Sequence, residues 1–600
     1  MPPNKIVVVG PGIVGMPMAA LLATSRSTDG SSPPRVVVVQ RNSATSGWKV
    51  DAINSGRSPL GDVEPHLARA VADGVASGRL SATHDAGTSS DADAILVCVP
   101  TDKAGLAPDL APLQDALRGV ACALRGRPVA TRPLVIIEST LAPSTMQSVV
   151  APLFAEHGLR DGQEVLLGNS PSRVRPRAAL TLLAGSDRIA AGLHPETPGT
   201  VAALYRRILS GGRVLVTNSL TAELVTTMEN AYRDVRIAFS AEVARYCDRV
   251  DVDFFTLRDQ VNDILGSSDG ASWDASIVPT GAMLVPTVGV GGPCLPKDGV
   301  LLWWRALEAG FPSRNSLILA ARAVNDASPA ATVRLARIEL GPLNGRKVAV
   351  LGAAYHADSD DTRYSPGLVL AALLRDSGAD VRLHDPHVAP HDANLARFGL
   401  DAHFTADLEL ALDARSAVFV TTAHGAYREL GPRLRQAASG IEGVIDACNL
   451  FHALDFSRTD LVYAGIGRGR RAPDSRLVHS VAAMHRAVAR GVSNEVVQLA
   501  GFLNDRYAPH ICDRINVDDA RRLAATSALG CDLCEPGDID VVEPVDGFIS
   551  GLAQLAVDAA ASGQRTPRVL PESVPPGLWF GNEDARVSET DTPWPLTPNQ

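Results

Sequence analysis

Several features that mark other protein classes are absent from this chain of 600 residues. No apolar run approaches the roughly 18 residues that a membrane-spanning helix needs, and the segment from Met1 to Lys5 lacks the layout of a signal peptide. The net charge of -10 argues against a nucleic-acid-binding surface, which needs clustered positive charge. Eight cysteines are scattered without the dense framework of a disulfide-rich secreted domain. We therefore expect a cytoplasmic protein with no membrane and no nucleic-acid partner.

The clearest motif that is present opens the chain. A short apolar strand, Lys5–Val9, runs into the loop Gly10-Pro11-Gly12-Ile13-Val14-Gly15 and then into an Ala-rich helix. Strand, G-x-G-x-x-G and helix in that order form the dinucleotide-binding fingerprint. Gly10 makes the turn, Gly12 lets a pyrophosphate approach, and Gly15 packs the helix on the strand. We predict that this loop, with Ile13 and Val14, binds a dinucleotide at the helix N-terminus.

Strands and helices alternate through most of the remaining chain, which favours doubly wound parallel sheets. A long helix over 219–250 separates two such α/β units, and its recurring apolar face indicates a core or a dimer interface. The second unit begins at Lys347 and lacks a full G-x-G-x-x-G, so we expect it to bind a nucleotide differently. Strands are predicted at 35–39, 94–99, 134–138, 347–352, 381–383, 418–421 and 443–445.

The octet Gly291-Gly292-Pro293-Cys294-Leu295-Pro296-Lys297-Asp298 places a thiol beside an ammonium and a carboxylate. Its glycines and prolines predict a tight, rigid turn. One reading is a nucleophilic Cys294 whose pKa is lowered by Lys297, with Asp298 as proton acceptor. The other is a structural turn with an unreactive thiol, and the octet alone does not decide between them.

Further motifs decide between them, because together they resemble the UDP-glucose/GDP-mannose dehydrogenase family over roughly residues 4–470. The run containing Arg233-Asp234-Val235 is similar to the branch that acts on N-acetylhexosamine nucleotides. The motifs that carry the resemblance, besides the glycine loop and the octet, are Ser58-Pro59-Leu60, Val99-Pro100-Thr101, Glu138-Ser139-Thr140, Ala222-Glu223-Leu224, Glu229–Val235 and Asp360–Pro366.

The resemblance implies oxidation of a nucleotide-sugar's C6 alcohol, through an aldehyde, to a carboxylate in two NAD-dependent hydride transfers. It implies that Cys294 attacks the aldehyde, that Asp298 and Lys297 assist beside it, and that Asn230 bonds the reacting oxygen. It also implies a homodimer formed through the long helix. The remaining positions that it implies are Thr101 and Thr140 at the nicotinamide, Arg363 at the phosphates, and Gly291 and Arg173 at the substrate.

The resemblance breaks at five positions where the family binds ligands or does chemistry. Gln40 and then Arg41 stand where an acidic residue would hold the ribose of NAD, so NADP is the alternative cofactor. The other reading of Arg41 is a solvated side chain with no role at the cofactor. Ser172 replaces a glutamate that helps to activate water, and Thr226 replaces a lysine that stabilises an oxyanion. His356 replaces a lysine, and Cys448 replaces an arginine that contacts the nucleotide phosphates. These changes predict a retuned or degenerate site.

We predict an α/β architecture of two Rossmann-like doubly wound domains, a long central helix, a mainly helical extension and a disordered tail. The predicted boundaries are 1–218 for the NAD(P)-binding domain, 219–330 for the central helical and dimerisation domain, 331–470 for the nucleotide-sugar-binding domain, 471–562 for the extension and 563–600 for the tail.

The extension carries His510, Cys512, Cys531 and Cys534, whose spacing is too loose for a confident zinc site, so no metal is assigned. The predicted activity is an NAD(P)-dependent oxidation of a nucleotide-sugar through Cys294. The alternatives are a single two-electron oxidation or other redox step, which tolerates the loss of the glutamate and lysine, and a non-catalytic nucleotide-binding scaffold.

Overall fold

The computed structural model describes residues 3–25, 33–61, 64–128, 132–174, 178–265, 281–308, 316–435, 440–452, 456, 460–526, 533–538 and 550–561. The chain forms two compact units. Unit 1 comprises Met1–Glu229, Leu301–Phe311 and Val496–Asp532. Unit 2 comprises Asn230–Val300, Pro312–Glu495 and Leu533–Gln600. The predicted tail, 563–600, lies outside the described residues.

Unit 1 is built on an eight-stranded sheet in the order β10-β9-β8-β7-β4-β1-β2-β3, in which β8 and β9 alone pair antiparallel. Its strands are runs of β-branched and aliphatic residues, as expected for strands covered on both faces. Their bounds are β1 (Lys5–Val9), β2 (Arg35–Val39), β3 (Leu80–Thr83), β4 (Ala94–Val97), β7 (Leu134–Ile137), β8 (Leu166–Asn169), β9 (Arg188–Gly192) and β10 (Val214–Val216).

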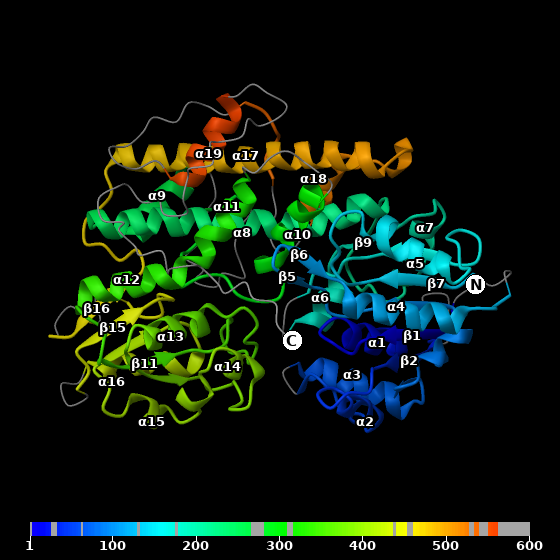
Figure 1. The fold of residues 1–600 in the computed structure, drawn as a ribbon, viewed down its shortest axis with the longest axis horizontal. Coiled ribbons are helices and arrows are strands. Elements are labelled where there is room, and N and C mark those ends of the chain that lie inside the picture. The colour runs from blue at the N-terminus through cyan, green and yellow to red at the C-terminus, as the bar shows by residue number, and fades with distance from the viewer. Residues whose placement is uncertain are drawn as a thin grey trace. The chain divides into compact units, whose positions relative to one another are not determined.

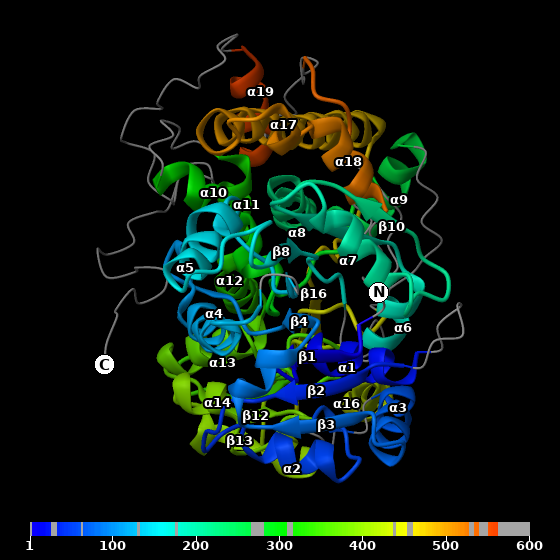
Figure 2. The ribbon, with the colours of Figure 1, turned by 90° about the vertical axis from the view of Figure 1, so that its right-hand side faces the viewer.

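Two hydrophobic clusters cover the two faces of this sheet. Alternate residues of β1 divide between them, since Ile6 and Val8 lie in one cluster and Val7 in the other. The first cluster is completed by α1 (Gly15–Thr24), α3 (Pro65–Ala76), α6 (Ala179–Gly185) and α7 (Thr197–Tyr205), and the second by α4 (Ala111–Leu124) and α5 (Ala151–Glu156). Figure 2 shows α1 and α3 on one side of β1 and α4 on the other. The helix α2 (Trp48–Asn54) and the hairpin of β5 (Asp102–Ala104) and β6 (Ala107–Asp109) are also in this unit.

Unit 2 contains an all-parallel sheet of six strands in the order β13-β12-β11-β14-β15-β16 (Figure 1). The order reverses between β11 and β14, which makes the carboxyl ends of these strands the expected ligand crevice. The bounds are β11 (Lys347–Leu351), β12 (Asp380–His384), β13 (Phe404–Thr405), β14 (Ala417–Val420), β15 (Gly443–Asp446), β16 (Val462–Gly465), α12 (Ser328–Leu340), α13 (Pro366–Asp376), α14 (Ala393–Arg397), α15 (Leu408–Leu412) and α16 (Leu430–Leu434).

The remaining helices belong to the centre of the sequence and to the extension. The predicted long helix is confirmed as α8 (Ser219–Val250), which spans 32 residues. It is followed by α9 (Phe254–Leu265), α10 (Leu295–Glu308) and α11 (Leu317–Asp326). The extension forms α17 (Ser475–Tyr507), α18 (Val517–Ala525) and α19 (Gly551–Ala561), so its described part is mainly helical, as predicted. None of the described helices has the length and apolar character that crossing a membrane requires.

Candidate active site

The glycine loop packs tightly at its two ends and is open in its middle. Gly10 has a φ of +94°, and a Cβ added there would lie 2.6 Å from the carbonyl oxygen of Cys98. A Cβ on Gly15 would lie 2.0 Å from the carbonyl oxygen of Gly10. No described atom lies within 4 Å of the same position on Gly12. The second glycine therefore leaves room for a pyrophosphate at the start of α1.

The rest of the predicted loop forms the entry into α1. The carbonyl oxygen of Gly12 accepts the N–H of Met16, and that of Val14 accepts the N–H of Met18. Ile13 lies between these two acceptors, so its backbone is fixed by the first helical turn. The loop thus has the strand-turn-helix geometry that its sequence predicts.

The end of β2 carries an amide in place of a carboxylate. Gln40 Nε2 donates to the carbonyl oxygen of Arg41 (3.0 Å) and to Ser46 Oγ (2.9 Å), and Arg41 itself is exposed. At the same edge of the sheet, Thr101 Oγ1 donates to the carbonyl oxygen of Thr140 (2.8 Å). These two threonines follow neighbouring strands and contact each other, whereas the residue directly after β2 is not an acid.

Ser172 is tied to a buried carboxylate. Its hydroxyl donates to Glu138 Oε2 at 2.5 Å. Arg188 Nη2 donates to both oxygens of Glu138, at 3.0 and 2.8 Å, and the Tyr205 hydroxyl donates to Oε1. The Arg188 guanidinium also lies 4.2 Å above the Tyr205 ring. With its proton committed to Glu138, the Ser172 hydroxyl does not replace a general base.

The side chain of Arg173, which was predicted to bind substrate, is bound by a carboxylate, a hydroxyl and a carbonyl oxygen of this protein. Its Nη2 lies 2.6 Å from Glu229 Oε1, and the two side chains are 7% and 0% exposed. The same guanidinium donates to Thr526 Oγ1 and to the carbonyl oxygen of Leu523, both at 3.0 Å. On α8, Thr226 is buried, and its hydroxyl has no hydrogen-bond partner within the part of unit 1 that is described. That hydroxyl is a polar group left for a ligand.

The octet forms the rigid turn that its glycines and prolines predict. Gly292 has a φ of +91°, and its N–H donates to the carbonyl oxygen of Arg363 at 2.9 Å. A Cβ on Gly291 would lie 2.5 Å from the Cβ of Tyr355. Cys294 then directly precedes α10, and its carbonyl oxygen accepts the N–H of Asp298 at 2.9 Å. The turn is locked against the loop that follows β11.

A buried chain of polar groups lies beside this cysteine. Asn230 Nδ2 donates to Asp298 Oδ2 at 2.6 Å, and Lys297 Nζ lies 2.5 Å from Asp298 Oδ1. Asp298 is fully buried, and Asn230 and Lys297 are nearly so. The oxygen of the Asn230 amide has no hydrogen-bond partner among the described residues. The structure thus brings together the four residues predicted to be catalytic, all within unit 2.

The thiol is not activated in this arrangement, which corrects the sequence-based expectation. Burial raises the pKa of Cys294 to about 11, and the Asp298 carboxylate adds to that rise. Lys297 and Arg363 act in the opposite direction and do not overcome it. The reason is that Lys297 is paired with Asp298, so its charge is largely cancelled at the sulfur. Cys294 is therefore a protonated thiol near neutral pH and needs a proton acceptor before it attacks.

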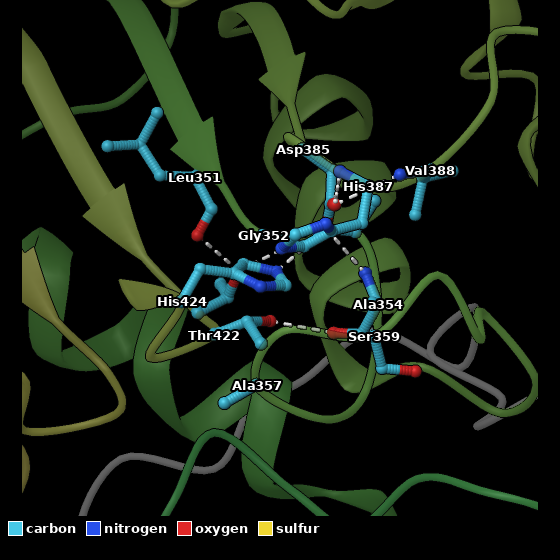
Figure 3. Close-up of polar contacts among 12 residues, drawn as sticks. Leu351, Gly352, Ala354, Ala357, Ser359, Asp385, His387, Val388, Thr422 and His424 are labelled. Atoms are coloured by element: carbon cyan, nitrogen blue, oxygen red, sulfur yellow. Dashed lines mark hydrogen bonds and ion pairs between the residues drawn. The ribbon is translucent and has the colours of Figure 1, made fainter. Parts of the chain in front are cut away.

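The carboxyl ends of β11, β12 and β14 hold a second polar cluster (Figure 3). Asp385 Oδ2 accepts the N–H groups of Ala353 (2.8 Å) and Ala354 (2.9 Å) and lies 3.0 Å from His424 Nε2. Burial raises the pKa of Asp385, but His424 and the backbone N–H groups of Ala354 and His387 together outweigh this and hold the pKa below its usual value. Asp385 thus fastens the loop after β11 to the sheet.

His387 and Asp358 lie close to His424 and raise the question of a metal ion. His387 Nε2 is 3.6 Å from Asp358 Oδ1. However, His424 Nδ1 accepts the N–H of Asp358 at 2.8 Å, which puts the ring's proton on Nε2, facing Asp385. Both ring nitrogens are then used, so His424 has no lone pair to give a cation.

The positions predicted to contact phosphates carry little free positive charge. Arg363 Nη2 lies 2.6 Å from Asp361 Oδ2. His356 is exposed, and its Nδ1 lies 2.9 Å from the carbonyl oxygen of Ala357. Cys448 Sγ is 3.6 Å from Asp446 Oδ1, and burial raises the pKa of this thiol. A diphosphate at this edge would meet one guanidinium, already paired, and no lysine.

Three family models match successive parts of the chain. The NAD-binding domain of the UDP-glucose/GDP-mannose dehydrogenase family matches residues 4–209. Its central domain matches 220–327, and its UDP-binding domain matches 349–453. The chain belongs to the UDP-glucose/GDP-mannose dehydrogenase family. It is thus an NAD-dependent dehydrogenase of the nucleotide-sugar type, and all three matches end before the extension.

Individual family members cover most of the chain. A UDP-N-acetyl-D-mannosamine dehydrogenase of Pyrococcus horikoshii is 30% identical over 471 residues, which are 78% of this chain and 99% of the relative. An NDP-N-acetyl-D-galactosaminuronic acid dehydrogenase of Ralstonia nicotianae is 30% identical over 71% of this chain and 92% of its own. The crystal structure of such an enzyme from Methanosarcina mazei superposes with a TM-score of 0.65 at 31% identity, covering 78% and 96% of the two chains.

The residues of unit 1 fit the NAD of the family in part. Gly12 leaves an open cradle for the pyrophosphate, and the Thr101 and Thr140 pair lies at the same sheet edge. Gln40 offers no carboxylate to the ribose hydroxyls. When bound, NAD supplies the acceptor for hydride; the loop from Gly10 to Gly15 would hold it.

Sequence reasoning missed Arg188, Tyr205, Asp385 and His424. Arg188 begins a strand that is otherwise apolar, which is a signal that its charge is paired inside the unit. Asp385 directly follows β12, just as Gln40 directly follows β2. This equivalent place at the end of the second strand was the available signal. Nothing in the sequence pairs His424 with it.

Proposed function

We propose that this family member oxidises the C6 alcohol of a nucleotide-activated sugar, with the thiol of Cys294 capturing the aldehyde. The observation that carries the proposal is the buried chain from Asn230 through Asp298 to Lys297 beside the locked cysteine turn. A scaffold without chemistry has no use for a buried lysine, carboxylate and thiol held together. The first substrates to test are nucleotide-activated N-acetylhexosamines, because relatives over most of the chain are named for them.

The residues have complementary tasks in this proposal. Asp298 is in place as the base that takes the proton of the alcohol, and bound NAD would supply the hydride acceptor. The sulfur of Cys294 bonds to the aldehyde carbon as the C=O double bond opens, and the thiol proton passes to the aldehyde oxygen, which the Asn230 amide holds. A second hydride leaves this adduct to give a thioester, and water releases the carboxylate. Two molecules of NAD are reduced for each sugar.

A second candidate is an oxidation that stops after the first hydride, at the aldehyde. Two observations favour it. The Ser172 hydroxyl is committed to Glu138, and the hydroxyl of Thr226 replaces a cationic group with a neutral one. Both changes act on the later steps, in which water attacks and an oxyanion develops, more than on the first hydride transfer.

Cofactor stoichiometry separates the two candidates. Purified protein is incubated with a limiting amount of each nucleotide-sugar and excess NAD or NADP, and the reduced cofactor is counted. Two per sugar, abolished by Cys294→Ser, supports the full oxidation. One per sugar, with an aldehyde trapped by hydroxylamine, supports the partial one. The double variant Ser172→Glu, Thr226→Lys then sharpens the result, since it should convert one equivalent into two. Absence of turnover with every sugar would overturn both.

The cytoplasmic location and the homodimer stay predictions. The packing of the extension favours a different assembly from a homodimer through α8.

A further inference from the structure

The extension repeats the order of helices found in the central domain. The central domain has α8, of 32 residues, then the short α9 and, later, α11. The extension has α17, of 33 residues, then the short α18 and, later, α19. Both long helices begin with serine, at Ser219 and Ser475. In unit 2, the first half of α17 lies along the second half of α8 (Figure 1), where the rings of His485 and Phe239 are 5.5 Å apart.

The long helix of the central domain caps the last helix of the extension. Glu242 on α8 accepts the hydroxyl of Ser550 at 2.5 Å and the N–H of Leu552 at 3.4 Å. Ser550 is the residue before α19, and its own hydroxyl oxygen accepts the N–H of Ala553 at 3.3 Å. The start of α19 is thereby fixed by a half-buried carboxylate.

The long helix of the extension caps the last helix of the central domain in the same way. Glu495 on α17 accepts the hydroxyl of Ser316 at 2.5 Å and the N–H of Leu317 at 2.9 Å. Ser316 is the residue before α11, and its hydroxyl oxygen accepts the N–H of Leu319 at 3.0 Å. In both places a glutamate of one long helix accepts the hydroxyl of the capping serine and an N–H group at the start of the capped helix. Because each module's long helix binds the other module's last helix, the contact has the reciprocal form of an isologous interface.

Short sequence matches accompany the repeated contacts. Both capping glutamates lie in the pattern Ser-x-Glu-Val, at Ser240–Val243 and Ser493–Val496. The segment leading to α9 reads Cys-Asp-Arg-Val-Asp-Val-Asp over 247–253, and the segment leading to α18 reads Cys-Asp-Arg-Ile-Asn-Val-Asp over 512–518. The spacing between the two patterns differs, because the extension inserts residues between the end of α17 and α18. A copy that has diverged accounts for both the matches and the insertion.

We propose that α17, α18 and α19 are a divergent second copy of the central helical domain and act as a built-in partner for it. The family resemblance predicts that two subunits pair their central helical domains. In this proposal, a single chain forms that pair by itself. Little of α8 is open to a second chain, since every residue from Ser219 to Tyr232 is buried and Arg249 is the one exposed residue in the rest of the helix. The exposed positions of α17 include Arg476, Arg486 and Asp505, which suit solvent rather than another copy.

The second copy also reaches the predicted substrate side of unit 1. The end of α18 supplies the two neutral oxygen acceptors, from Leu523 and Thr526, that hold Arg173. The extension carries no counterpart of the octet with Cys294. The chain thus has one catalytic turn served by two helical modules, instead of two turns in a symmetric dimer.

The first test is the mass of the intact chain in solution. Sedimentation equilibrium over a wide range of protein concentration should give a single species at the chain mass, 63.0 kDa. A stable species of twice that mass at low concentration would overturn the proposal, because the built-in copy leaves no need for a second chain. Neither result depends on whether the protein turns over a nucleotide-sugar.

The second test compares the two reciprocal caps in the full-length chain. Glu242→Ala and Glu495→Ala should lower the Tm by a similar amount, about 1–3 °C each, as expected for the loss of one helix cap in a large protein. The control Asp505→Ala, on the exposed face of α17, should leave the Tm unchanged. Hydrogen exchange should speed up at the start of α19 in the first variant and at the start of α11 in the second. Unequal effects, or exchange that changes in neither helix, would show that the two contacts are not equivalent.

Discussion

In the sheets of both units, the first strand runs into a glycine with positive φ. These glycines are Gly10 after β1 and Gly352 after β11. In both, a glycine in the following helix lets helix and strand approach. A Cβ on Gly15 would lie 2.0 Å from the carbonyl oxygen of Gly10, and a Cβ on Gly367 would lie 2.5 Å from that of Gly352. The packing is the same, although the two glycines are close in sequence in one unit and separated by a long loop in the other.

The difference lies in what fills the space between those glycines. In unit 1, Gly12 faces open space, and the position after β2 is an amide. In unit 2, the carboxylate after β12 binds the loop's own N–H groups, and Tyr355 packs against the cysteine turn. One loop leaves open space for a ligand, whereas the other is fastened by Asp385 and packs against the turn that carries Cys294. The same strand-to-helix junction therefore serves binding in one unit and positioning in the other.

The largest expected effect separates the two roles within the first glycine loop. Gly15→Ala should disrupt the folding of unit 1, since its Cβ would meet backbone that has no room to move. Gly12→Ala should leave the Tm unchanged and weaken NAD binding, because the methyl group enters open space. Thermal unfolding and calorimetric titration with NAD measure the two effects. An unchanged NAD affinity in Gly12→Ala would remove this loop from the cofactor site.

The next effect tests whether the second junction is structural. His424→Ala removes the imidazole that donates to the buried Asp385 carboxylate and should destabilise the protein by about 1.5–3 kcal/mol, as for the loss of a hydrogen bond to a charged group. His387→Ala, at the exposed edge of the same cluster, is the control and should cost little. Denaturant unfolding of the three proteins makes the comparison.

The contact between Asp385 and His424 should also change how the stability of the protein depends on pH in acid. Because the pKa of Asp385 is held below its unfolded value, its contribution to stability is complete above about pH 4 and is lost as the pH falls further. This loss should be smaller in His424→Ala than in the wild type. An identical acid limb in both proteins would mean that His424 does not hold the carboxylate.

Much of the fold follows from local pattern. The strand after the N-terminus, the glycine loop and the whole of α8 are visible in the sequence, since period and turn chemistry specify them within a few residues. The sequence predicted that Asp298, Lys297 and Asn230 lie in one site, but not which of their atoms pair. Its consequence for the thiol, a raised pKa, depends on burial and on which charge is nearest, and neither can be read from spacing. The reciprocal contacts of Glu242 and Glu495 join residues that are far apart in the chain, so no local pattern announces them.

A smaller effect on cofactor affinity is expected at the residue after β2. This residue is Gln40, whereas the equivalent residue after β12 is Asp385. Gln40→Asp restores a carboxylate to the position that binds ribose hydroxyls in dinucleotide sites. A hydrogen bond to a carboxylate is worth about 1.5–3 kcal/mol, so NAD should bind at least tenfold more tightly, roughly, and NADP should not gain. Arg41→Ala is the matched variant, and a loss of NADP binding there would assign the cation to a 2′-phosphate. Equal affinities for both cofactors in wild type and Gln40→Asp would leave this position without a role.

The smallest effect is at the cysteine turn that the second junction holds. The Asp298 carboxylate raises the pKa of Cys294 and Lys297 lowers it, so the two variants should shift its reactivity in opposite directions. Alkylation of Cys294 by iodoacetamide near neutral pH should be several-fold faster in Asp298→Asn and slower in Lys297→Gln, because the thiolate is the reacting form. Peptide mass spectrometry follows Cys294 and the exposed Cys512 in the same sample, and the latter serves as the internal standard. A shift of both thiols together would indicate a general loosening of the protein. A change at Cys294 alone, with opposite signs in the two variants, would show that this one pair of charges sets how readily the buried sulfur becomes a nucleophile.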